Sequence, residues 1–164
     1  MKFMIAGLGS IGRRHLRNLV ASGERDILLF RTHQSTLPDE ELSAFPVETD
    51  LDKALAHKPD AVIVANPTSL HLDIALLAAQ AGCNLFLEKP IADRLSEKVM
   101  ALQEIVTAQN LKVLVGFQFR FHPTLGQIRT LIVSNKLGRP LSFRAHWGEY
   151  LPGWHPWEDY RRSY

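Results

Sequence analysis

A glycine-rich hexapeptide directly after the first apolar run constrains this chain more than any other feature. Residues Gly7 to Gly12 read G-x-G-x-x-G, follow the apolar run Lys2–Ala6 and open the helix-period segment Ile11–Ser22. In such a strand–turn–helix, the first glycine permits a tight turn and the second lets a pyrophosphate approach the backbone. The third lets helix and strand pack closely, and the helix N-terminus offers free N–H groups to phosphates. The pattern predicts a dinucleotide site, with a glycine-rich turn that binds nothing as the alternative. The site residues would be Gly7, Gly9, Ser10, Ile11 and Gly12.

Short apolar runs alternate with helix-period segments as far as residue 117. The runs are continuous rather than alternating in polarity, which is typical of parallel strands buried on both faces. We therefore expect an α/β fold, a Rossmann-type doubly wound parallel sheet. The expected strands are Lys2–Ala6, Ile27–Phe30, Val47–Glu48, Ala61–Ala65, Asn84–Leu87 and Val113–Phe117. The expected helices are Ile11–Ser22, Leu51–Ala56 with Asp50 as its N-cap, Leu70–Ala81 and Ser96–Gln109, and residues 32–46 are expected to form a loop.

The pattern changes near residue 118, where we place the boundary between a dinucleotide-binding domain (1–118) and a second domain (119–164). Pro123 is expected in the first turn of a helix that runs to about Lys136 and stops at Gly138. Residues 141–151 alternate in polarity, which predicts a strand of an antiparallel sheet with one covered face. A segment of this size rarely buries enough surface to fold without help, so we expect an incomplete α+β domain. The alternative is a helix–strand extension that folds back on the first domain.

Composition excludes several classes of protein. The 19 Lys and Arg against 17 Asp and Glu give a net charge of +2, too balanced for nucleic-acid binding by bulk charge. No stretch approaches the ~20 apolar residues of a membrane span, and the N-terminus lacks the features of a signal peptide. The single cysteine, Cys83, fits a reducing compartment, and no His, Cys, Asp or Glu group has metal-ligand spacing. We expect a cytoplasmic protein with no nucleic-acid, membrane or metal partner.

The end of the second expected strand bears on which dinucleotide is bound. An acid about 20 residues after the fingerprint would accept a hydrogen bond from the ribose 2′-OH of NAD. The sequence has Arg31 and Thr32 there, with no acid before Asp39. A guanidinium suits a 2′-phosphate, so we favour NADP over NAD. The alternative is that Arg31 is solvated and stacks on adenine without choosing between the cofactors.

Two more groups of polar residues follow buried strands, at the end where open α/β sheets bind ligands. Asn66, Pro67 and Thr68 follow the strand at 61–65, and His71 opens the next helix. These residues are predicted to contact the cofactor, although a helix N-cap shaped by the proline is an equally good and compatible interpretation.

The second group, Glu88-Lys89-Pro90, follows the strand Asn84–Leu87. An ammonium beside the crevice suits substrate binding and proton transfer. The alternative is a solvated loop pair.

These motifs, followed by G-F-Q-F-R-F-x-P at Gly116–Pro123, occur in an order that resembles the glucose–fructose oxidoreductase/inositol dehydrogenase family of NAD(P)-dependent sugar and polyol oxidoreductases. The resemblance covers essentially the whole chain, and E-K-P at this spacing after the fingerprint is a specific marker, much more so than the glycines. It implies that Lys89 lies between nicotinamide and substrate, often with a cis peptide to Pro90. It also implies that Glu88 orients this loop beside the nicotinamide ribose, and that Asn66 and His71 line the cofactor cleft.

The resemblance extends to the second domain. It implies that Arg120 lies at the domain junction and contacts substrate. Gln118 takes the place of a more common Asn near the cofactor, with an amide whose reach is one methylene longer. The pair Tyr160-Arg161 resembles an aromatic–Arg pair on the substrate side.

The implied activity is hydride transfer between a nicotinamide cofactor and a sugar, sugar derivative or cyclitol, with Lys89 as a catalytic residue. In the family an acid/base His lies beyond the position of Tyr164, so we expect this chain to bind cofactor with little or no turnover. A non-catalytic dinucleotide-binding sensor or regulatory module is the alternative, and Lys89 argues against it. We also expect a homo-oligomer formed through the second-domain sheet.

Overall fold

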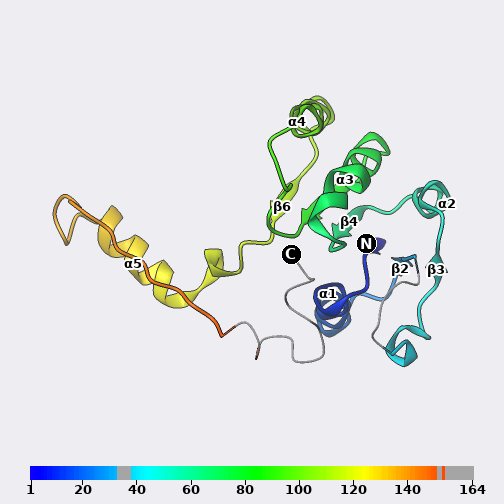
Figure 1. The fold of residues 1–164 in the computed structure, drawn as a ribbon, viewed down its shortest axis with the longest axis horizontal. Coiled ribbons are helices and arrows are strands. Elements are labelled where there is room, and N and C mark those ends of the chain that lie inside the picture. Colours follow the sequence, from blue (N-terminus) through cyan, green and yellow to red (C-terminus); the bar gives the residue numbers. More distant parts are fainter. Residues whose placement is uncertain (33–37, 151–152, 154–164) are drawn as a thin grey trace. The chain divides into compact units, whose positions relative to one another are not determined.

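A six-stranded parallel sheet forms the centre of the first unit of the chain (Figure 1). The computed structural model describes residues 1–32, 38–150 and 153, and the chain divides after Gln118 into two compact units. Every pair of neighbouring strands is parallel, which confirms the predicted Rossmann-type sheet. The strands are β1 (Phe3–Ala6), β2 (Ile27–Phe30), β3 (Val47–Glu48), β4 (Ala61–Val64), β5 (Asn84–Leu87) and β6 (Val113–Val115), in the spatial order β3-β2-β1-β4-β5-β6.

The helices between these strands lie where the apolar periodicity predicts them, within one or two residues at each end. They are α1 (Ser10–Ala21), α2 (Leu51–Ala56), α3 (His71–Gln80) and α4 (Glu97–Ala108), with short 3₁₀ turns η1 (Glu40–Leu42) and η2 (Thr68–Leu70). Asp50 caps α2 as predicted, because its carboxylate accepts a hydrogen bond from the Lys53 N–H at 3.0 Å. The expected loop at 32–46 contains η1, whose Leu42 is buried in the core. Residues 33–37 lie outside the described part.

The core has two halves, one on each face of the sheet. In β1, Met4 belongs to one cluster and Ile5 to the other, and Val62 and Ile63 of β4 divide in the same way. Side chains of α2, α3 and α4 complete the first cluster, whereas Leu16 of α1 completes the second. Successive residues of a strand point to opposite faces, so a strand covered on both sides is apolar throughout. This explains the continuous apolar runs in the sequence.

The boundary between the two units falls within the 3₁₀ turn η3 (Gln118–Phe121), directly after Gln118. The second unit also contains the helix α5 (Pro123–Val133). Pro123 occupies the first turn of α5 as predicted, but the helix ends earlier than the predicted Lys136. Asn135 adopts a left-handed conformation (φ 55°), and the Lys136 N–H donates to the carbonyl of Leu131 at 3.2 Å. This arrangement satisfies the last carbonyls of the helix, so the chain turns before it reaches Gly138.

The strand predicted at 141–151 is not formed in the described residues 141–150. A strand needs a neighbour for its backbone hydrogen bonds, and the described part of the second unit offers none. The apolar side chains of the alternating pattern are exposed, with Phe143 at 85% and Trp147 at 71%. The Trp147 ring contacts only one aromatic neighbour there, Phe119, edge to face at a centroid distance of 5.1 Å. The alternating pattern indicates an amphipathic segment, but a strand also requires a partner strand.

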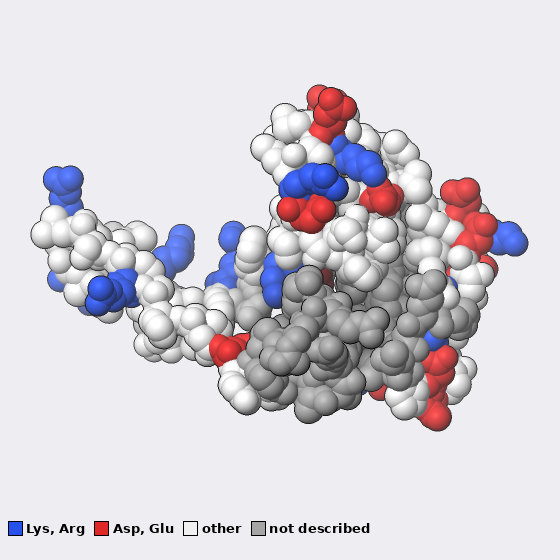
Figure 2. All heavy atoms as spheres, viewed as in Figure 1, with Lys and Arg blue, Asp and Glu red and all other residues white. Residues whose placement is uncertain are grey.

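Acidic and basic side chains are intermixed on the visible face of the first unit (Figure 2). Over α4 and α3, for example, Lys98 forms an ion pair with Asp73. Within the described residues, no helix is both long enough and apolar enough to cross a membrane.

Two glycines allow α1 to begin directly over the end of β1. Gly7 has a left-handed φ of 92°, and a Cβ there would lie 2.5 Å from the backbone nitrogen of Asn66. A Cβ on Gly12 would lie 1.9 Å from the carbonyl oxygen of Gly7. Both distances are far below van der Waals contact, so no side chain fits at either position. A Cβ on Gly9, in contrast, would meet no atom of the described chain within 4 Å.

We expect Gly12→Ala to lower the free energy of unfolding by about 3 kcal/mol or more, because its methyl group meets backbone that cannot move aside. Gly9→Ala is the matched control and should cost about 1 kcal/mol or less, through its N-cap position alone. Urea denaturation followed by circular dichroism at 222 nm measures both. Equal losses in the two variants would contradict the close approach of α1 to the loop after β1.

Candidate active site

The polar residues singled out in the sequence meet at one edge of the sheet. The strand register pairs Ala6 with Phe30 and with Val64, and Val64 with Leu87. The residues that follow these strand ends therefore emerge side by side at the carboxyl edge. The spatial order reverses direction between β1 and β4, and this switch point is where open parallel sheets bind ligands.

The loop after β1 leaves room for an anion at the start of α1. Among the described residues, no atom lies within 4 Å of the position of a Cβ on Gly9, and Gly9, the N-cap of α1, has no side chain that could bond the first N–H groups of the helix. No acidic residue lies in the first turn, which begins with Ser10 and Ile11. A helix N-terminus carries N–H groups without intrahelical partners and a partial positive charge. This arrangement fits a pyrophosphate, as the fingerprint predicts.

Arg31 follows β2 directly and is buried, with an exposed side-chain fraction of 6%. Its Nη1 lies 2.9 Å from Oδ1 of Asp39, and its Nε has no partner among the described residues. Arg31 is therefore not solvated as the alternative had it, and its role in the choice of cofactor stays a prediction. Thr32, predicted beside it in the cofactor site, is exposed.

Arg13 of α1 reaches the same carboxylate and was missed in the sequence. Its Nη2 lies 3.3 Å from Asp39 Oδ1, its Nε donates to the Leu8 carbonyl at 2.9 Å, and its Nη1 donates to the carbonyl of Pro38. The Arg31 hydrogen bond is the main cause that holds the pKa of Asp39 below its usual value, and Arg13 adds to it. The position of Arg13, directly after the last fingerprint glycine, was the available signal.

Asn66 follows β4, and its side-chain amide is buried at both polar atoms without a hydrogen-bond partner in the described residues. The N-cap of the turn η2 is Pro67, so the capping interpretation does not account for this amide. A buried amide without partners is costly unless a ligand or water completes its hydrogen bonds. Asn66 therefore fits the predicted role of a cofactor contact. Thr68 opens η2 beside it.

His71 joins the loop after β4 to the loop after β5. Its Nε2 lies 2.8 Å from the carbonyl oxygen of Asn66, and its Nδ1 lies 2.9 Å from the carbonyl oxygen of Pro90. The residue is only 2% exposed. With both ring nitrogens engaged, His71 positions the two loops that line the edge, and a direct contact with cofactor stays a prediction.

Glu88 is buried and bridges α1 to the loop that carries Lys89. Its Oε1 lies 2.8 Å from Nε2 of His15, and its Oε2 accepts a hydrogen bond from the Lys89 N–H at 3.2 Å. Burial raises the pKa of Glu88, but the hydrogen bond and charge of His15 and the Lys89 N–H outweigh it and leave the pKa below its ordinary value. The alternative of a solvated loop pair is thus wrong for Glu88. His15, three residues after Gly12, was not singled out in the sequence.

Lys89 itself is exposed at the carboxyl edge. Its peptide bond to Pro90 is cis, as the family resemblance implies. The side chain of Glu88 contacts His15 and the Lys89 N–H, so Glu88 holds the Lys89 loop against α1, and the place of this loop beside a nicotinamide ribose stays a prediction. No group of three or more His, Cys, Asp or Glu within the described ranges is placed to hold a metal ion.

The remaining predicted residues belong to the boundary and the second unit. Gln118 and Arg120 are exposed in η3. Tyr160 and Arg161 lie outside the described residues. The roles of all four stay predictions.

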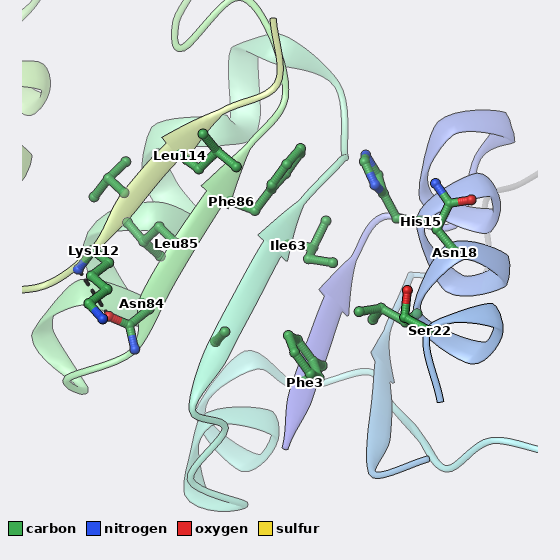
Figure 3. A pocket seen from close by; sticks show the side chains of 13 residues that line it. Phe3, His15, Asn18, Ser22, Ile63, Asn84, Leu85, Phe86, Lys112 and Leu114 are labelled. Atoms are coloured by element: carbon green, nitrogen blue, oxygen red, sulfur yellow. Dashed lines mark hydrogen bonds between the residues drawn. The ribbon is translucent and has the colours of Figure 1, made fainter. Parts of the chain in front are cut away.

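A separate apolar hollow of about 390 Å³ lies along one face of the sheet, beside α1 (Figure 3). Phe3, Ile63, Leu85 and Leu114 from four strands line it, and His15 closes its end near α1. None of the fingerprint glycines and neither Asn66 nor Lys89 is among its lining residues. The hollow is therefore distinct from the carboxyl edge where the polar residues meet.

Comparison with known proteins agrees with this geometry. A family profile described as an oxidoreductase family with an NAD-binding Rossmann fold matches residues 1–117, more than half of the chain. The chain belongs to the glucose–fructose oxidoreductase/inositol dehydrogenase family. The resemblance inferred from the motifs is thereby confirmed.

Two relatives and one solved structure illustrate this membership. Scyllo-inositol 2-dehydrogenase (NAD(+)) of Bacillus subtilis (strain 168) is 34% identical over 150 residues, which are 86% of this chain and 42% of that protein. Levoglucosan dehydrogenase of Pseudarthrobacter phenanthrenivorans is 36% identical over 104 residues, 62% of this chain and 26% of that protein. The structure of scyllo-inositol dehydrogenase from Lactobacillus casei with bound cofactor NAD(H) and scyllo-inositol matches with a TM-score of 0.70 at 29% identity. That match covers 84% of this chain and 42% of the Lactobacillus casei protein. The chain therefore spans about two fifths of the length of such relatives.

We expect Glu88→Gln to lower the free energy of unfolding by about 1–3 kcal/mol at pH 7, because the buried bond to His15 loses its charge. Since folding lowers the pKa of Glu88, its contribution is present above the ordinary glutamate pKa. It is lost as the pH falls through the lower folded value. Urea denaturation of wild type and variant between pH 7 and pH 3 should therefore show the difference shrinking.

Glu104→Gln, on the exposed face of α4, is the control and should change stability little at any pH. An E88Q deficit that is no larger than that of E104Q, or that persists undiminished at pH 3, would contradict the structural role of the His15–Glu88 pair.

Proposed function

We propose that this chain is the dinucleotide-binding part of an NAD(P)-dependent oxidoreductase that acts on a sugar, sugar derivative or cyclitol. One observation carries the proposal: the open space at Gly9, the amide of Asn66, which has no partner in the described residues, and the exposed Lys89 belong to loops at one sheet edge. The first two fit a dinucleotide, and the third fits a substrate oxygen. The names of the inositol dehydrogenases to which the chain is similar support this substrate class.

The residues present fit a nicotinamide dinucleotide. The loop from Gly7 to Gly12 and the N-terminus of α1 would hold the pyrophosphate. Asn66, Pro67 and Thr68 would contact the half of the cofactor nearer to Lys89, and His71 and Glu88 would hold those loops in place. When bound, the nicotinamide ring would accept or donate the hydride.

Lys89 would bind the reacting oxygen of the substrate and hold or pass on its proton. An exposed ammonium is suited to both tasks when its loop is held in place. The hydrogen bond from the Lys89 N–H to Glu88 would keep this backbone close to the cofactor. In the second unit, Arg120 and the pair Tyr160-Arg161 would contact the substrate, and Gln118 would lie beside the cofactor.

For the cofactor we propose a preference for NADP over NAD. Two arginines, Arg13 and Arg31, converge on the carboxylate of Asp39 beside the fingerprint loop. Two guanidinium groups at this place support binding of a 2′-phosphate. Because Arg31 is buried against Asp39, the phosphate would reach it by displacing that carboxylate.

The wider setting of the protein is also proposed. The single buried cysteine supports a cytoplasmic location. The exposed apolar side chains of residues 141–150 support pairing with further strands and a homo-oligomer formed through the second-domain sheet.

Titration of NADPH and NADH into the chain, followed by nicotinamide fluorescence, tests the cofactor proposal. We expect both to bind and NADPH to bind more tightly. Arg31→Ala should remove the preference, Gly9→Ala should weaken both, and Lys53→Ala on α2 should change neither. Absence of binding would contradict the dinucleotide site, whereas equal affinities in the wild type would contradict the NADP preference.

Replacement of Lys89 tests the proposed chemistry in a protein that also carries the substrate domain. We expect Lys89→Met to lower kcat for polyol-dependent reduction of the cofactor by about 10²–10⁴-fold, the usual contribution of a proton-transfer group. Cofactor affinity, measured by the same fluorescence titration, should change far less than kcat. A loss of affinity with no loss of kcat would contradict the catalytic role.

A further inference from the structure

The ion cluster beside the fingerprint loop has an unusual distribution of exposure. The side chains of Arg13 and Arg31 are 4% and 6% exposed, whereas that of Asp39, which lies between them, is 55% exposed. Both cations approach the same oxygen, Oδ1. The anion of the cluster thus lies at its solvent side, where a dissolved anion can replace it.

The chain holds Asp39 in this place from two directions. Arg13 binds the carbonyls of Leu8 and Pro38, which ties the segment before Asp39 to the fingerprint loop. On the other side, Leu42 is buried in the core and its N–H donates to the carbonyl of Asp39 at 2.9 Å. Asp39 is the N-cap of η1, yet its side chain makes no capping hydrogen bond. Its carboxylate is turned to the arginines instead.

The place is also the one that an adenosine ribose would face. Arg31 directly follows β2, and the Gly7 N–H donates to the carbonyl of Phe30 at 3.1 Å. The ion cluster therefore adjoins the fingerprint loop. Arg31 Nε has no partner among the described residues, so the carboxylate leaves part of the guanidinium's donor capacity unused. A phosphate offers three oxygens in place of two and a larger negative charge.

We infer that Asp39 sets the cofactor specificity of this chain, because its carboxylate occupies the position between Arg31 and Arg13 that a 2′-phosphate requires. This inference rests on the proposed dinucleotide function. It adds that the carboxylate of Asp39 competes with a 2′-phosphate for the two arginines. NADP must displace the carboxylate, whereas NAD, which has a 2′-hydroxyl, has no need to. Asp39 therefore limits the NADP preference that the arginines create.

Asp39→Asn tests this inference, because the amide keeps the shape and removes the charge. Nicotinamide fluorescence titrations give the ratio of the Kd for NADH to the Kd for NADPH. We expect this ratio to rise about tenfold or more in D39N, through tighter NADPH binding. Glu40→Gln is the matched control, since Glu40 is the exposed neighbouring acid and takes part in no ion pair of the described chain. It makes the same change in net charge and should leave the ratio within about twofold.

An unchanged ratio in D39N, or an equal rise in E40Q, would overturn the inference while leaving the dinucleotide site intact. Failure of the wild type to bind either nucleotide would instead overturn the proposed function. Asp39→Ser provides a second variant, which also removes the carboxylate but replaces it with a smaller side chain, so an effect of the Asn side chain itself can be recognised. Thermal melting with each nucleotide gives an independent readout, because a ligand that binds the folded state raises Tm. NADPH should raise the Tm of D39N and D39S more than that of the wild type, and equal rises would count against the inference.

Discussion

The absence of side chains at Gly7 and Gly12 is the constraint on which the rest of the site depends. A Cβ at either position would overlap backbone of the neighbouring loop, so only glycines let α1 start against the ends of β1 and β4. This contact brings the positive end of a helix to the switch point of the sheet. It also brings the loop after β4 within reach of the fingerprint loop. The N-terminus of α1 and the loop that carries the Asn66 amide are neighbours because of it.

Buried polar side chains then fix the loops at this edge of the sheet. His71 joins the loops after β4 and β5, Glu88 joins the Lys89 loop to His15 of α1, and Arg13 joins the fingerprint loop to the segment before η1. Each of these groups would be costly to bury without its partners, and each has partners from a distant part of the chain. Pre-organised loops reduce the ordering that cofactor and substrate must bring about on binding.

The arrangement separates the tasks of the proposed reaction. Binding groups for the dinucleotide would come from backbone and from Asn66, whereas the exposed ammonium of the E-K-P motif would be left for the substrate. The arginine pair lies at the other side of the fingerprint loop, with β2, where the adenosine half would be held. In the proposed reaction, cofactor choice and hydride chemistry would therefore depend on different residues.

The sequence by itself determined the elements of the first unit and the nature of its site. Apolar runs specify strands buried on both faces, and the fingerprint specifies a helix over a strand, because both are set by local periodicity and by close packing around glycine. The tertiary structure alone determined which charged and polar side chains form pairs. Asp39 pairs with Arg31 across a loop, and Glu88 pairs with His15, which is 73 residues away in the sequence. No local sequence pattern predicts either pair. The segment at 141–150 is a second case in which the sequence pattern was insufficient. Its polarity alternates as in a strand, but a strand forms only where another backbone supplies its hydrogen bonds.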